Sequence, residues 1–481
     1  MRLDQLAPAL APLEVLRPAA VEITDLAYDT RTVHPGDLFF CVRGERVDGH
    51  GLAAEALTRG AVALVVDRPL DAEAPQVVVD DVRRAMGRAA DHFFGSPTSE
   101  LRVAGVTGTN GKTTTAFLLY SVLAAAGARP GLLGTVESRV GGRSRPVVRT
   151  TPEAIDLHRT FREMLDAGDR SCAMEASSHA SELQRLVGVR FAVLVFTNLT
   201  QDHLDFHGTL ERYFEAKRRL FLERPETPAA VNVDDPYGQR LADELLAKGR
   251  RVLRFGASAS AEVRAEDLEL SAAGASLRAS GIDLRTPLRG RFNVENVLAT
   301  VAAARLLEIE DAAIARGVEE LAGVPGRFEA VDEGQPFTVI VDYAHTPDSL
   351  ERVLRAARDL AENRLVCVFG CGGDRDRGKR PVMGRTVSEL ADSVIVTADN
   401  PRSEDLSTIL AEILEGAGSE AEVEPDRSAA IAKAIGGAGP GDVIVIAGKG
   451  HEQGQQLADR TLPFDDRAVA RRELRRLGAR A

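Results

Sequence analysis

The sequence lacks the features that mark secreted, membrane-spanning or nucleic-acid-binding proteins. No apolar run reaches the roughly 20 residues needed to cross a bilayer, and the first residues lack the charged-then-apolar pattern of a secretory signal. Lys and Arg number 60 against 72 Asp and Glu, so the formal net charge is -12. That balance argues against the positive charge typical of nucleic-acid-binding proteins. We expect a cytoplasmic protein with no membrane segment and no nucleic-acid partner.

Cysteines are scarce as well, with only four in 481 residues. That number is too small for a disulfide scaffold in a chain of this length. Cys367 and Cys371 have a spacing that half a metal site could use, but no second pair follows. All four cysteines lie in or beside apolar stretches, so we expect buried free thiols.

One glycine-rich segment has the pattern of a phosphate-binding loop. An apolar strand at residues 101–106 leads into a turn, and a helix begins at Lys112. In such a loop backbone N–H groups converge on a polyphosphate, the lysine adds charge, and the hydroxyl of Thr113 is available to Mg²⁺. The common P-loop pattern has a glycine where this chain has Val106. The surrounding strand and helix still favour nucleotide binding over a merely structural turn.

Strand-like and helix-like segments alternate along most of the chain, without internal repeats or low-complexity stretches. This alternation predicts an α/β fold with mostly parallel sheets covered by helices on both faces. The length requires more than one core. We expect three domains: a small N-terminal α/β domain (residues 1–98), a central P-loop-type domain (99–325) and a C-terminal Rossmann-like domain (326–481).

Polar residues follow two apolar strands of the central domain. Glu175 ends the strand at 171–175, and His203 stands in a polar loop after the strand at 191–197. Ligands of parallel sheets bind at the carboxyl ends of strands, so both residues are expected to face the phosphate loop's crevice. A buried acid favours a cation partner. His203 taken alone also fits a structural histidine, and Lys217, in a basic run, also fits a solvated helix face.

The C-terminal domain places basic and acidic residues together after its strands. Arg375, Arg402 and Lys449 are interspersed with Asp399 and Glu452. Guanidinium groups bind carboxylates and acids bind ammonium, so this mixture favours a zwitterionic amino acid. A nucleotide site facing such a pocket indicates ATP-driven joining of a carboxylate to an amine through an acyl phosphate. No triad with a known family's spacing is present, so an acyl-enzyme is not indicated.

The chain resembles the Mur ligase family over essentially its whole length. The matching motifs are Gly108-Thr-Asn-Gly-Lys-Thr-Thr114, Met174-Glu-Ala-Ser-Ser-His179, Thr197-Asn-Leu-Thr-Gln-Asp-His-Leu-Asp-Phe-His-Gly208, Ala216-Lys217 with Leu220-Phe221, Asn293-Val-Glu-Asn296, Pro325-Gly-Arg-Phe-Glu329, Asp342-Tyr-Ala-His-Thr-Pro347 and Gly448-Lys-Gly-His-Glu452. Within the family, the resemblance is to the enzymes that attach meso-2,6-diaminopimelate to UDP-MurNAc-L-Ala-D-Glu. It implies an ADP-forming acid–amino-acid ligase of peptidoglycan precursor synthesis, which we expect to be a monomer.

The resemblance also implies roles for individual residues. The catalytic residues would be Lys112, Glu175, His203 and Lys217. ATP would be bound by Gly108, Thr109, Asn110, Gly111, Lys112, Thr113, Thr114, Asn296, Arg327 and Asp342. Mg²⁺ would be held by Thr113, Glu175, His203 and Lys217, the last as a carbamate. The UDP-MurNAc-dipeptide would be bound by the N-terminal domain through Thr30 and residues 45–47, and by Thr150, Thr151, Ser177 and Arg185. Diaminopimelate would be bound by the C-terminal domain through Arg375, Asp399, Asn400, Pro401, Arg402, Gly448 and Glu452.

Arg402 provides a physical reason for the choice of amino acid. Diaminopimelate differs from lysine by a carboxylate at its far end, with which a guanidinium can form a bidentate pair. Lysine would leave that guanidinium unpaired, at a cost of order a few kcal/mol. The resemblance agrees, because Asn400-Pro401-Arg402 is typical of the diaminopimelate-adding members.

Three positions depart from the family pattern. Thr30 replaces a usual serine, Arg149 a usual asparagine before Thr150, and Ser181 a usual leucine. Two other functions fit parts of the sequence. A folylpolyglutamate synthetase would share the ATP-binding core, but residues 29–31 and 400–402 argue against it. A nucleotide-binding scaffold without transfer chemistry is disfavoured because Lys112, Glu175, His203 and Lys217 are all retained.

Overall fold

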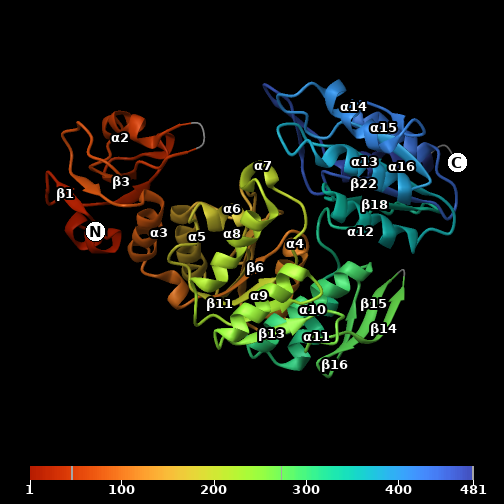
Figure 1. The fold of residues 1–481 in the computed structure, drawn as a ribbon, viewed down its shortest axis with the longest axis horizontal. Helices are drawn as coiled ribbons and strands as arrows, with labels where there is room; N and C mark the ends of the chain where they lie inside the picture. The colour runs from red at the N-terminus through yellow and green to blue at the C-terminus, as the bar shows by residue number, and fades with distance from the viewer. Residues whose placement is uncertain (45–46, 272, 479–481) are drawn as a thin grey trace. The chain divides into compact units, whose positions relative to one another are not determined.

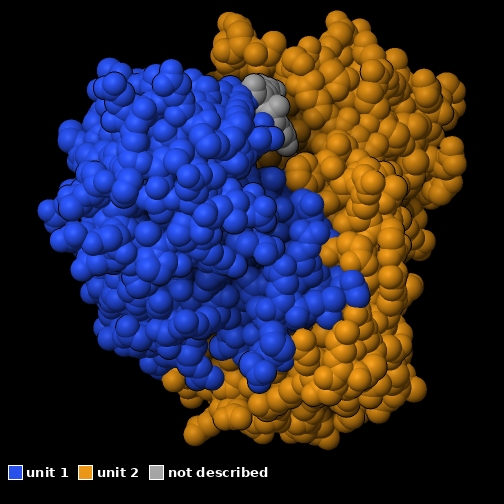
Figure 2. Space-filling view, turned by 60° about the vertical axis from the view of Figure 1, so that its left-hand side comes forward, with its two compact units in different colours: residues 1–107, 127–194, 216–227 blue, residues 108–126, 195–215, 228–481 orange. Residues whose placement is uncertain are grey.

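A computed structural model describes residues 1–44, 47–271 and 273–478. The chain forms two compact units that interleave along the sequence (Figure 2). The first contains residues 1–107, 127–194 and 216–227, and the second contains residues 108–126, 195–215 and 228–481. The expected domain boundaries near residues 98 and 325 stay a prediction.

The N-terminal residues form a five-stranded sheet of order β1-β5-β4-β3-β2. Its strands are β1 (Glu14–Leu16), β2 (Asp25–Ala27), β3 (Asp37–Phe40), β4 (Ala63–Val66) and β5 (Gln76–Val78). All pairings are parallel except that of β1 with β5. Helices α1 (Leu3–Leu10) and α3 (Val82–Phe93) pack on one face, and α2 (Ala53–Thr58) packs on the other. A 3₁₀ turn, Gly49–Leu52, leads directly into α2.

The central sheet has eight strands in the order β13-β12-β11-β6-β10-β7-β8-β9. The strands are β6 (Arg102–Thr107), β7 (Pro130–Leu133), β8 (Ser138–Val140), β9 (Arg143–Arg145), β10 (Ser171–Glu175), β11 (Phe191–Phe196), β12 (Ala229–Asn232) and β13 (Val252–Phe255). β6, β10 and β7 pair in parallel, with Cys172 opposite both Val103 and Gly131, whereas β8 and β9 are antiparallel. A separate three-stranded antiparallel sheet consists of β14 (Glu266–Ser271), β15 (Gly274–Ala279) and β16 (Ile282–Thr286).

The C-terminal sheet has the order β17-β18-β22-β19-β20-β21 (Figure 1). Its strands are β17 (Glu329–Ala330), β18 (Thr338–Asp342), β19 (Leu365–Phe369), β20 (Ser393–Val396), β21 (Glu422–Val423) and β22 (Val443–Ala447). β22 shows why both faces are covered. Val443, Val445 and Ala447 point into one apolar cluster, and Ile444 and Ile446 point into the other.

Helices complete these two clusters and confirm the expected α/β class. On one face of the C-terminal sheet lie α12 (Pro347–Arg358), α13 (Lys379–Leu390) and α14 (Leu406–Ala417). On the other lie α15 (Arg427–Gly436) and α16 (Asp466–Gly478). The remaining helices are α4 (Lys112–Ala125), α5 (Ala154–Asp166), α6 (Ser178–Glu182), α7 (Leu204–His207), α8 (Leu210–Leu222), α9 (Pro236–Ala247), α10 (Arg291–Leu306) and α11 (Asp311–Glu320). No helix in the described part of the chain has the length and apolar character needed to span a membrane.

The four cysteines are buried free thiols, as expected. Burial raises the pKa of both Cys367 and Cys371 to about 12, so neither thiol is ionised near neutral pH. They belong to the apolar cluster under α12, α13 and α14.

One fully buried ion pair joins the two helices on the second face of the C-terminal sheet. Both side chains, Arg427 on α15 and Asp466 on α16, have an exposed fraction of zero. Arg427 donates through Nε and Nη2 to the carboxylate, at 2.8 and 2.7 Å. Its Nη1 and Nη2 also donate to the carbonyls of Ala398 and Ala447, at 3.2 and 2.9 Å. Burial acts to lower the pKa of Arg427, but Asp466 outweighs it and leaves that pKa raised.

We predict that Arg427→Met destabilises the protein by about 3–5 kcal/mol, because it leaves a buried carboxylate and two carbonyls without their donor. The melting midpoint, followed by circular dichroism, should fall by several degrees. Arg59→Met, which removes an exposed pair with Glu55 at 2.9 Å, is the control and should cost less than about 1 kcal/mol. Equal melting of the two variants would contradict the role of the buried pair.

Candidate functional site

The glycine-rich loop is packed so closely that its glycines are required. Gly108 has φ +149°, and a Cβ there would lie 1.9 Å from Thr197 Oγ1. Thr197 Oγ1 in turn donates to the carbonyl of Asn110 at 2.6 Å. Val106 lies within strand β6 and is fully buried, so the loop begins only at Gly108. The missing P-loop glycine therefore falls on a strand position, where the backbone needs no special conformation.

Several predicted nucleotide-binding residues meet at this loop. Lys112 Nζ donates to the carbonyls of Gly108 and Thr109, at 3.0 and 2.7 Å. Arg327 Nη2 donates to Thr113 Oγ1 at 3.1 Å. Asn296 Oδ1 accepts from Thr115 Oγ1 at 3.4 Å.

Arg327 also lies over the ring of Tyr343, with its guanidinium carbon 4.4 Å from the ring centroid. Asp342, which is 7% exposed, accepts the backbone N–H groups of Phe328 and Ala344. Burial raises the pKa of Asp342, although the charge of Arg327 opposes the shift. The aromatic face and the guanidinium together resemble a surface on which a planar base could stack.

Asp202 lies between two histidines. Its Oδ2 is 3.4 Å from His203 Nε2 and 3.8 Å from His345 Nε2. Burial acts to raise the pKa of Asp202, but the charges of His203, His345, Lys379 and Lys112 outweigh it, and the pKa falls below its usual range. His203 has φ +55°, a conformation uncommon outside glycine. The arrangement keeps a carboxylate ionised beside His203.

In the first compact unit, Glu175 is joined to several predicted substrate-binding residues. Glu175 is 1% exposed and accepts from Thr135 through N and Oγ1, at 2.7 and 3.0 Å. Thr135 Oγ1 is also 3.0 Å from Thr150 Oγ1. Thr151 Oγ1 donates to the Glu175 carbonyl at 2.8 Å and lies 3.2 Å from Ser177 Oγ. Thr135 was not among the residues expected from the sequence.

Glu153 is a second unexpected member of this region. It is 5% exposed and forms ion pairs with Arg185 at 2.9 Å, Arg83 at 3.2 Å and Arg149 at 3.7 Å. Arg149, which replaces the family asparagine, therefore has a carboxylate partner. Arg185 also donates to the carbonyl of Thr151 at 3.2 Å, which connects it to the same cluster.

Thr30, the residue predicted to bind substrate in the N-terminal domain, is not joined to this cluster by a described hydrogen bond. Thr30 is 5% exposed, and no described hydrogen bond joins its side chain to Thr150, Thr151, Ser177 or Arg185. Its neighbours Asp29 and Arg31 form a 2.5 Å ion pair. In the predicted loop at residues 45–47, Glu45 and Arg46 lie outside the described residues.

Lys217 lies on α8 and is only 1% exposed. A solvated helix face is therefore wrong for this lysine, although Arg218 and Arg219 beside it are partly exposed. Among the described residues, no group of three or more His, Cys, Asp or Glu side chains could hold a metal ion.

The acidic and basic residues of the C-terminal domain form one network at the ends of β20 and β22. Lys449, fully buried, donates to Asn400 Oδ1 at 2.8 Å and to Glu452 Oε2 at 3.1 Å. Asn400 Nδ2 donates to the same Glu452 oxygen at 2.8 Å. A Cβ on Gly448 would lie 2.5 Å from Asp399 Oδ2, so this position, at φ +117°, needs glycine.

Arg402 extends from this network toward the loop that carries Arg375. It is half-buried, with φ +53°, and donates through Nη1 to the Gly373 carbonyl at 2.5 Å. Burial, and then the nearby charge of Arg375, lower the pKa of Arg402. Two guanidinium groups that repel each other are stabilised when a carboxylate binds near both.

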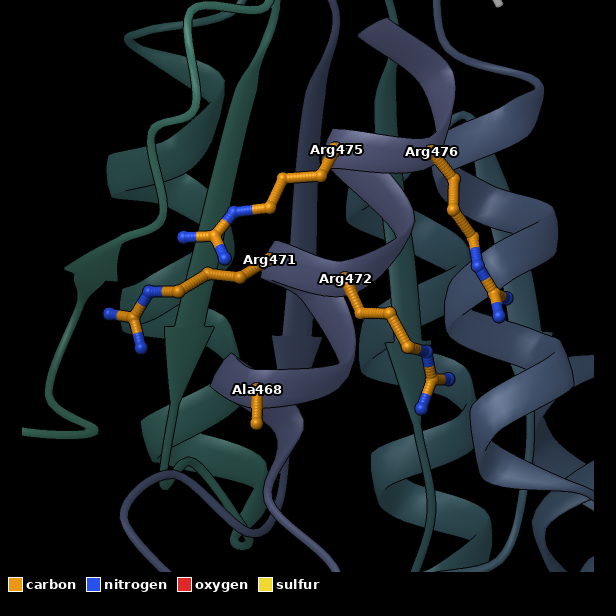
Figure 3. A pocket seen from close by; sticks show the side chains of 5 residues that line it. All are labelled: Ala468, Arg471, Arg472, Arg475 and Arg476. Carbon is orange, nitrogen blue, oxygen red and sulfur yellow. The ribbon is translucent and has the colours of Figure 1, made fainter. Parts of the chain in front are cut away.

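A surface hollow of about 550 Å³ on α16 is lined by none of the predicted site residues. It is lined by Ala468 and four arginines of α16 (Figure 3). Arg471 and Arg475 pair with Glu329 and Glu333, at 3.4 and 2.9 Å. Because these charges are already offset, the hollow is no candidate for the main site.

The glycine loop and the C-terminal network contain the kinds of groups that a ligase of an acid and an amine would use. The chain belongs to the Mur ligase family. Family models match residues 106–304 (Mur ligase middle domain), 326–450 (Mur ligase, glutamate ligase domain) and 22–94 (Mur ligase family, catalytic domain).

Individual relatives cover nearly the whole chain. A UDP-N-acetylmuramoyl-L-alanyl-D-glutamate–2,6-diaminopimelate ligase from Solibacter usitatus is 48% identical over 96% of this chain and 95% of its own length. A solved structure with the same protein name has a TM-score of 0.70 at 32% identity and covers 99% of both chains. A folylpolyglutamate synthase from Mycobacterium tuberculosis shares the fold, with a TM-score of 0.62 at 18% identity over 76% of this chain and 92% of its own.

We predict that Gly108→Ala weakens binding of a nucleoside triphosphate by at least about 10-fold. The added Cβ would overlap Thr197 Oγ1 and displace the loop. Titration with a fluorescent ATP analogue measures the effect. Gly323→Ala is the control, because its Cβ would meet nothing within 4 Å. Equal affinity in the two variants would show that the loop does not hold the phosphates.

Proposed function

We propose that this protein is an ATP-dependent ligase that adds meso-2,6-diaminopimelate to UDP-MurNAc-L-Ala-D-Glu. The observation that carries the proposal is the 48% identity, over 96% of the chain, to a relative that bears this activity in its name. The C-terminal network of acids, amide and guanidinium adds chemical support, since it suits an amino acid with charges at both ends. The nucleotide-sugar domain would be residues 1–98, the ATP-binding domain 99–325 and the amino-acid domain 326–481.

The proposed reaction has two steps. An oxygen of the substrate's glutamyl carboxylate attacks the γ-phosphorus of ATP, the bond to the β–γ bridging oxygen breaks, and ADP leaves. The amine of diaminopimelate then attacks the carbonyl carbon of the acyl phosphate. Inorganic phosphate departs with the C–O electron pair, the nitrogen loses a proton, and an amide remains.

Residues around the glycine loop would bind the nucleotide. The loop backbone at 108–114 and Lys112 would hold the phosphates, because converging N–H groups and an ammonium stabilise the charge that moves onto ADP. Asn296, Arg327 and Asp342 would bind the rest of ATP. The contact between Arg327 and Thr113 supports this grouping.

Mg²⁺ is the proposed metal, with Thr113, Glu175, His203 and a carbamate on Lys217 as its ligands. Oxygen donors predominate in this set, which fits a hard cation, and buried Glu175 and Lys217 fit groups that are neutralised on binding. The metal would supply charge neutralisation at the transferred phosphoryl group. Thr30, Thr150, Thr151, Ser177 and Arg185 would position the carboxylate substrate.

The amino-acid substrate would lie against Arg375, Gly448, Glu452 and residues 399–402. Arg402 would bind the carboxylate that lysine lacks, and the repulsion between Arg402 and Arg375 would be relieved by that anion. Asp399 and Glu452 would bind the ammonium groups. An enzyme that selects by a half-buried guanidinium can discriminate between substrates, because the wrong substrate leaves that group unpaired.

We predict that ADP-forming phosphate release requires both the nucleotide-sugar dipeptide and diaminopimelate, and that Arg402→Ala raises the KM for diaminopimelate at least about 10-fold. The KM for ATP should change less than twofold, because Arg402 lies in the amino-acid pocket. A panel of lysine, diaminopimelate and folate plus glutamate, with product masses measured, tests the substrate. Equal turnover with lysine would overturn the amino-acid assignment, and activity on folate would overturn the function.

We predict that Lys217→Ala lowers kcat about 100-fold, because a buried ligand-bearing side chain is lost. Lys248→Ala, at an exposed lysine, should leave kcat unchanged. The carbamate has its own readout: protein equilibrated with ¹³C-bicarbonate should show a carbamate carbon resonance that disappears in Lys217→Ala. Full activity of Lys217→Ala would exclude a catalytic role for this lysine.

A further inference from the structure

A small antiparallel hairpin lies beside the segment that carries Arg402. It consists of β23 (Gly454–Gln456) and β24 (Thr461–Pro463), with Gly454 opposite Pro463 and Gln456 opposite Thr461. The sequence motifs do not include it, and no role in the proposed reaction has been assigned to it above. Its contacts are concentrated on residues 399–402.

Four hydrogen bonds join the hairpin to this segment in register. Gln455 Nε2 donates to the Asp399 carbonyl at 2.9 Å, and the Gln456 N–H donates to Asn400 Oδ1 at 2.9 Å. The Arg402 N–H donates to the Gln456 carbonyl, and Arg402 Nε donates to Gln456 Oε1, both at 3.0 Å. Arg402 and Leu457 form a parallel bridge. The hairpin therefore holds both the backbone and the side chain of Arg402.

The guanidinium of Arg402 is fixed by two neutral acceptors. Nε is used by the amide oxygen of Gln456, and one Nη1 hydrogen is used by the carbonyl of Gly373. Of its five N–H donors, the other three, one on Nη1 and two on Nη2, have no hydrogen bond within the described part of the chain. Guanidinium N–H groups of this kind can form a bidentate pair with a carboxylate.

The neutrality of Gln456 matters as much as its position. A carboxylate at residue 456 would orient Arg402 equally well, but it would also cancel the charge that attracts a ligand carboxylate. Gln456 holds the guanidinium without neutralising it. Burial and the charge of Arg375 lower the pKa of Arg402, while the charges of Asp399, Glu452 and Asp374 act in the opposite direction.

We propose that Gln456 is a positioning residue that sets the specificity of the amino-acid pocket by fixing Arg402 while leaving its charge available. The inference rests on the proposed function, because it concerns the substrate carboxylate that Arg402 would bind. Gln456 acts through Arg402 and has no catalytic role. Its effect should therefore appear in the choice and affinity of the amino acid, and not in the phosphoryl-transfer step.

The test compares two substitutions of Gln456 with a control substitution of Gln453, which directly precedes β23. Gln456→Glu adds a charge that pairs with Arg402, and Gln456→Met removes the acceptor while keeping the length. Gln453→Met is the control, because both glutamines are exposed and only the Gln456 side chain has a described contact with Arg402. Steady-state kinetics are measured for diaminopimelate, L-lysine, ATP and the nucleotide-sugar dipeptide.

We expect Gln456→Glu to raise the KM for diaminopimelate at least about 10-fold and to lower the diaminopimelate-to-lysine ratio of kcat/KM by a similar factor. Gln456→Met should raise the same KM about threefold. The KM values for ATP and the nucleotide-sugar dipeptide, and kcat at saturating diaminopimelate, should stay within twofold. Gln453→Met should match the wild type.

Two results would overturn the inference while leaving the proposed function intact. One is an unchanged diaminopimelate-to-lysine ratio in Gln456→Glu when the wild type uses diaminopimelate. The other is an equal loss for all substrates, which is the result of a merely structural role. Absence of diaminopimelate-dependent phosphate release in the wild type would overturn both proposals. If Gln456→Glu does not fold, the threefold change in Gln456→Met, absent from Gln453→Met, decides the question.

Discussion

Strands that end inside a parallel sheet leave backbone carbonyls that must find donors, and Arg427 supplies donors to two of them. The carbonyls of Ala398 and Ala447 immediately precede Asp399 and Gly448 in the chain. A single buried guanidinium, which is paired with Asp466, therefore fixes the backbone positions at which both pocket segments leave the sheet. The proposed amino-acid pocket depends on this pair, although neither partner belongs to it. Removing the pair would disturb the pocket and the fold together, so its substitution tests stability rather than specificity.

The shape of the glycine-rich loop depends on a different constraint, which is the close packing of neighbouring side chains against its glycines. The positions that Cβ atoms would occupy at Gly108 and Gly111 are taken by Thr197 and Asn296. The neighbours of the loop therefore fix its shape without any contribution from a bound anion. Because the loop is already ordered before a ligand binds, little binding free energy is lost in ordering it. The phosphates are then bound more tightly. Asn296 was assigned to the nucleotide by resemblance, and its contact with this loop gives it a second, local reason to be there.

The parts of the fold that sequence patterns predicted well are those with continuous apolar runs. The strand expected at 171–175 is β10, and the strand expected at 191–197 is β11, which ends one residue earlier, because strands covered on both faces are apolar along most of their length. Helix α15 was not anticipated, since its apolar residues are mostly alanines interspersed with polar ones. The β23–β24 hairpin has no alternating apolar pattern at all. It is held by polar contacts to a segment about fifty residues away, and such contacts leave no local signal.

In the site too, residues within short sequence motifs could be predicted, whereas contacts between residues far apart in the chain could not. The glycine loop and the strand-end acids follow from short motifs, so they could be found by reading the chain. Thr135 meets Glu175, and Glu153 meets Arg83, across 40 and 70 residues, and neither partnership is visible in a motif. Lys217 gave a misleading signal, because a basic run on a helix usually faces water, and only the packing of α8 shows that this lysine is buried. The family resemblance assigned it a role that periodicity alone would have missed.

The partners of the arginines separate those that support the structure from those available to ligands. Arg380 pairs with Glu404 and Glu412 at 2.8 and 2.6 Å, and Arg427 pairs with Asp466. Arg327 and Arg402 are instead held by a hydroxyl, an aromatic ring, an amide oxygen and a backbone carbonyl. A guanidinium held by neutral groups keeps its charge for an incoming anion, whereas the charge of one paired with a carboxylate is already largely neutralised. Arg185 is the informative exception among the proposed substrate-binding residues, because Glu153 lies 2.9 Å from its Nε. Its charge is offset within the protein, so a substrate would be bound there mainly through geometry and hydrogen bonds. The electrostatic selection of an amino acid with a second carboxylate would fall to Arg402.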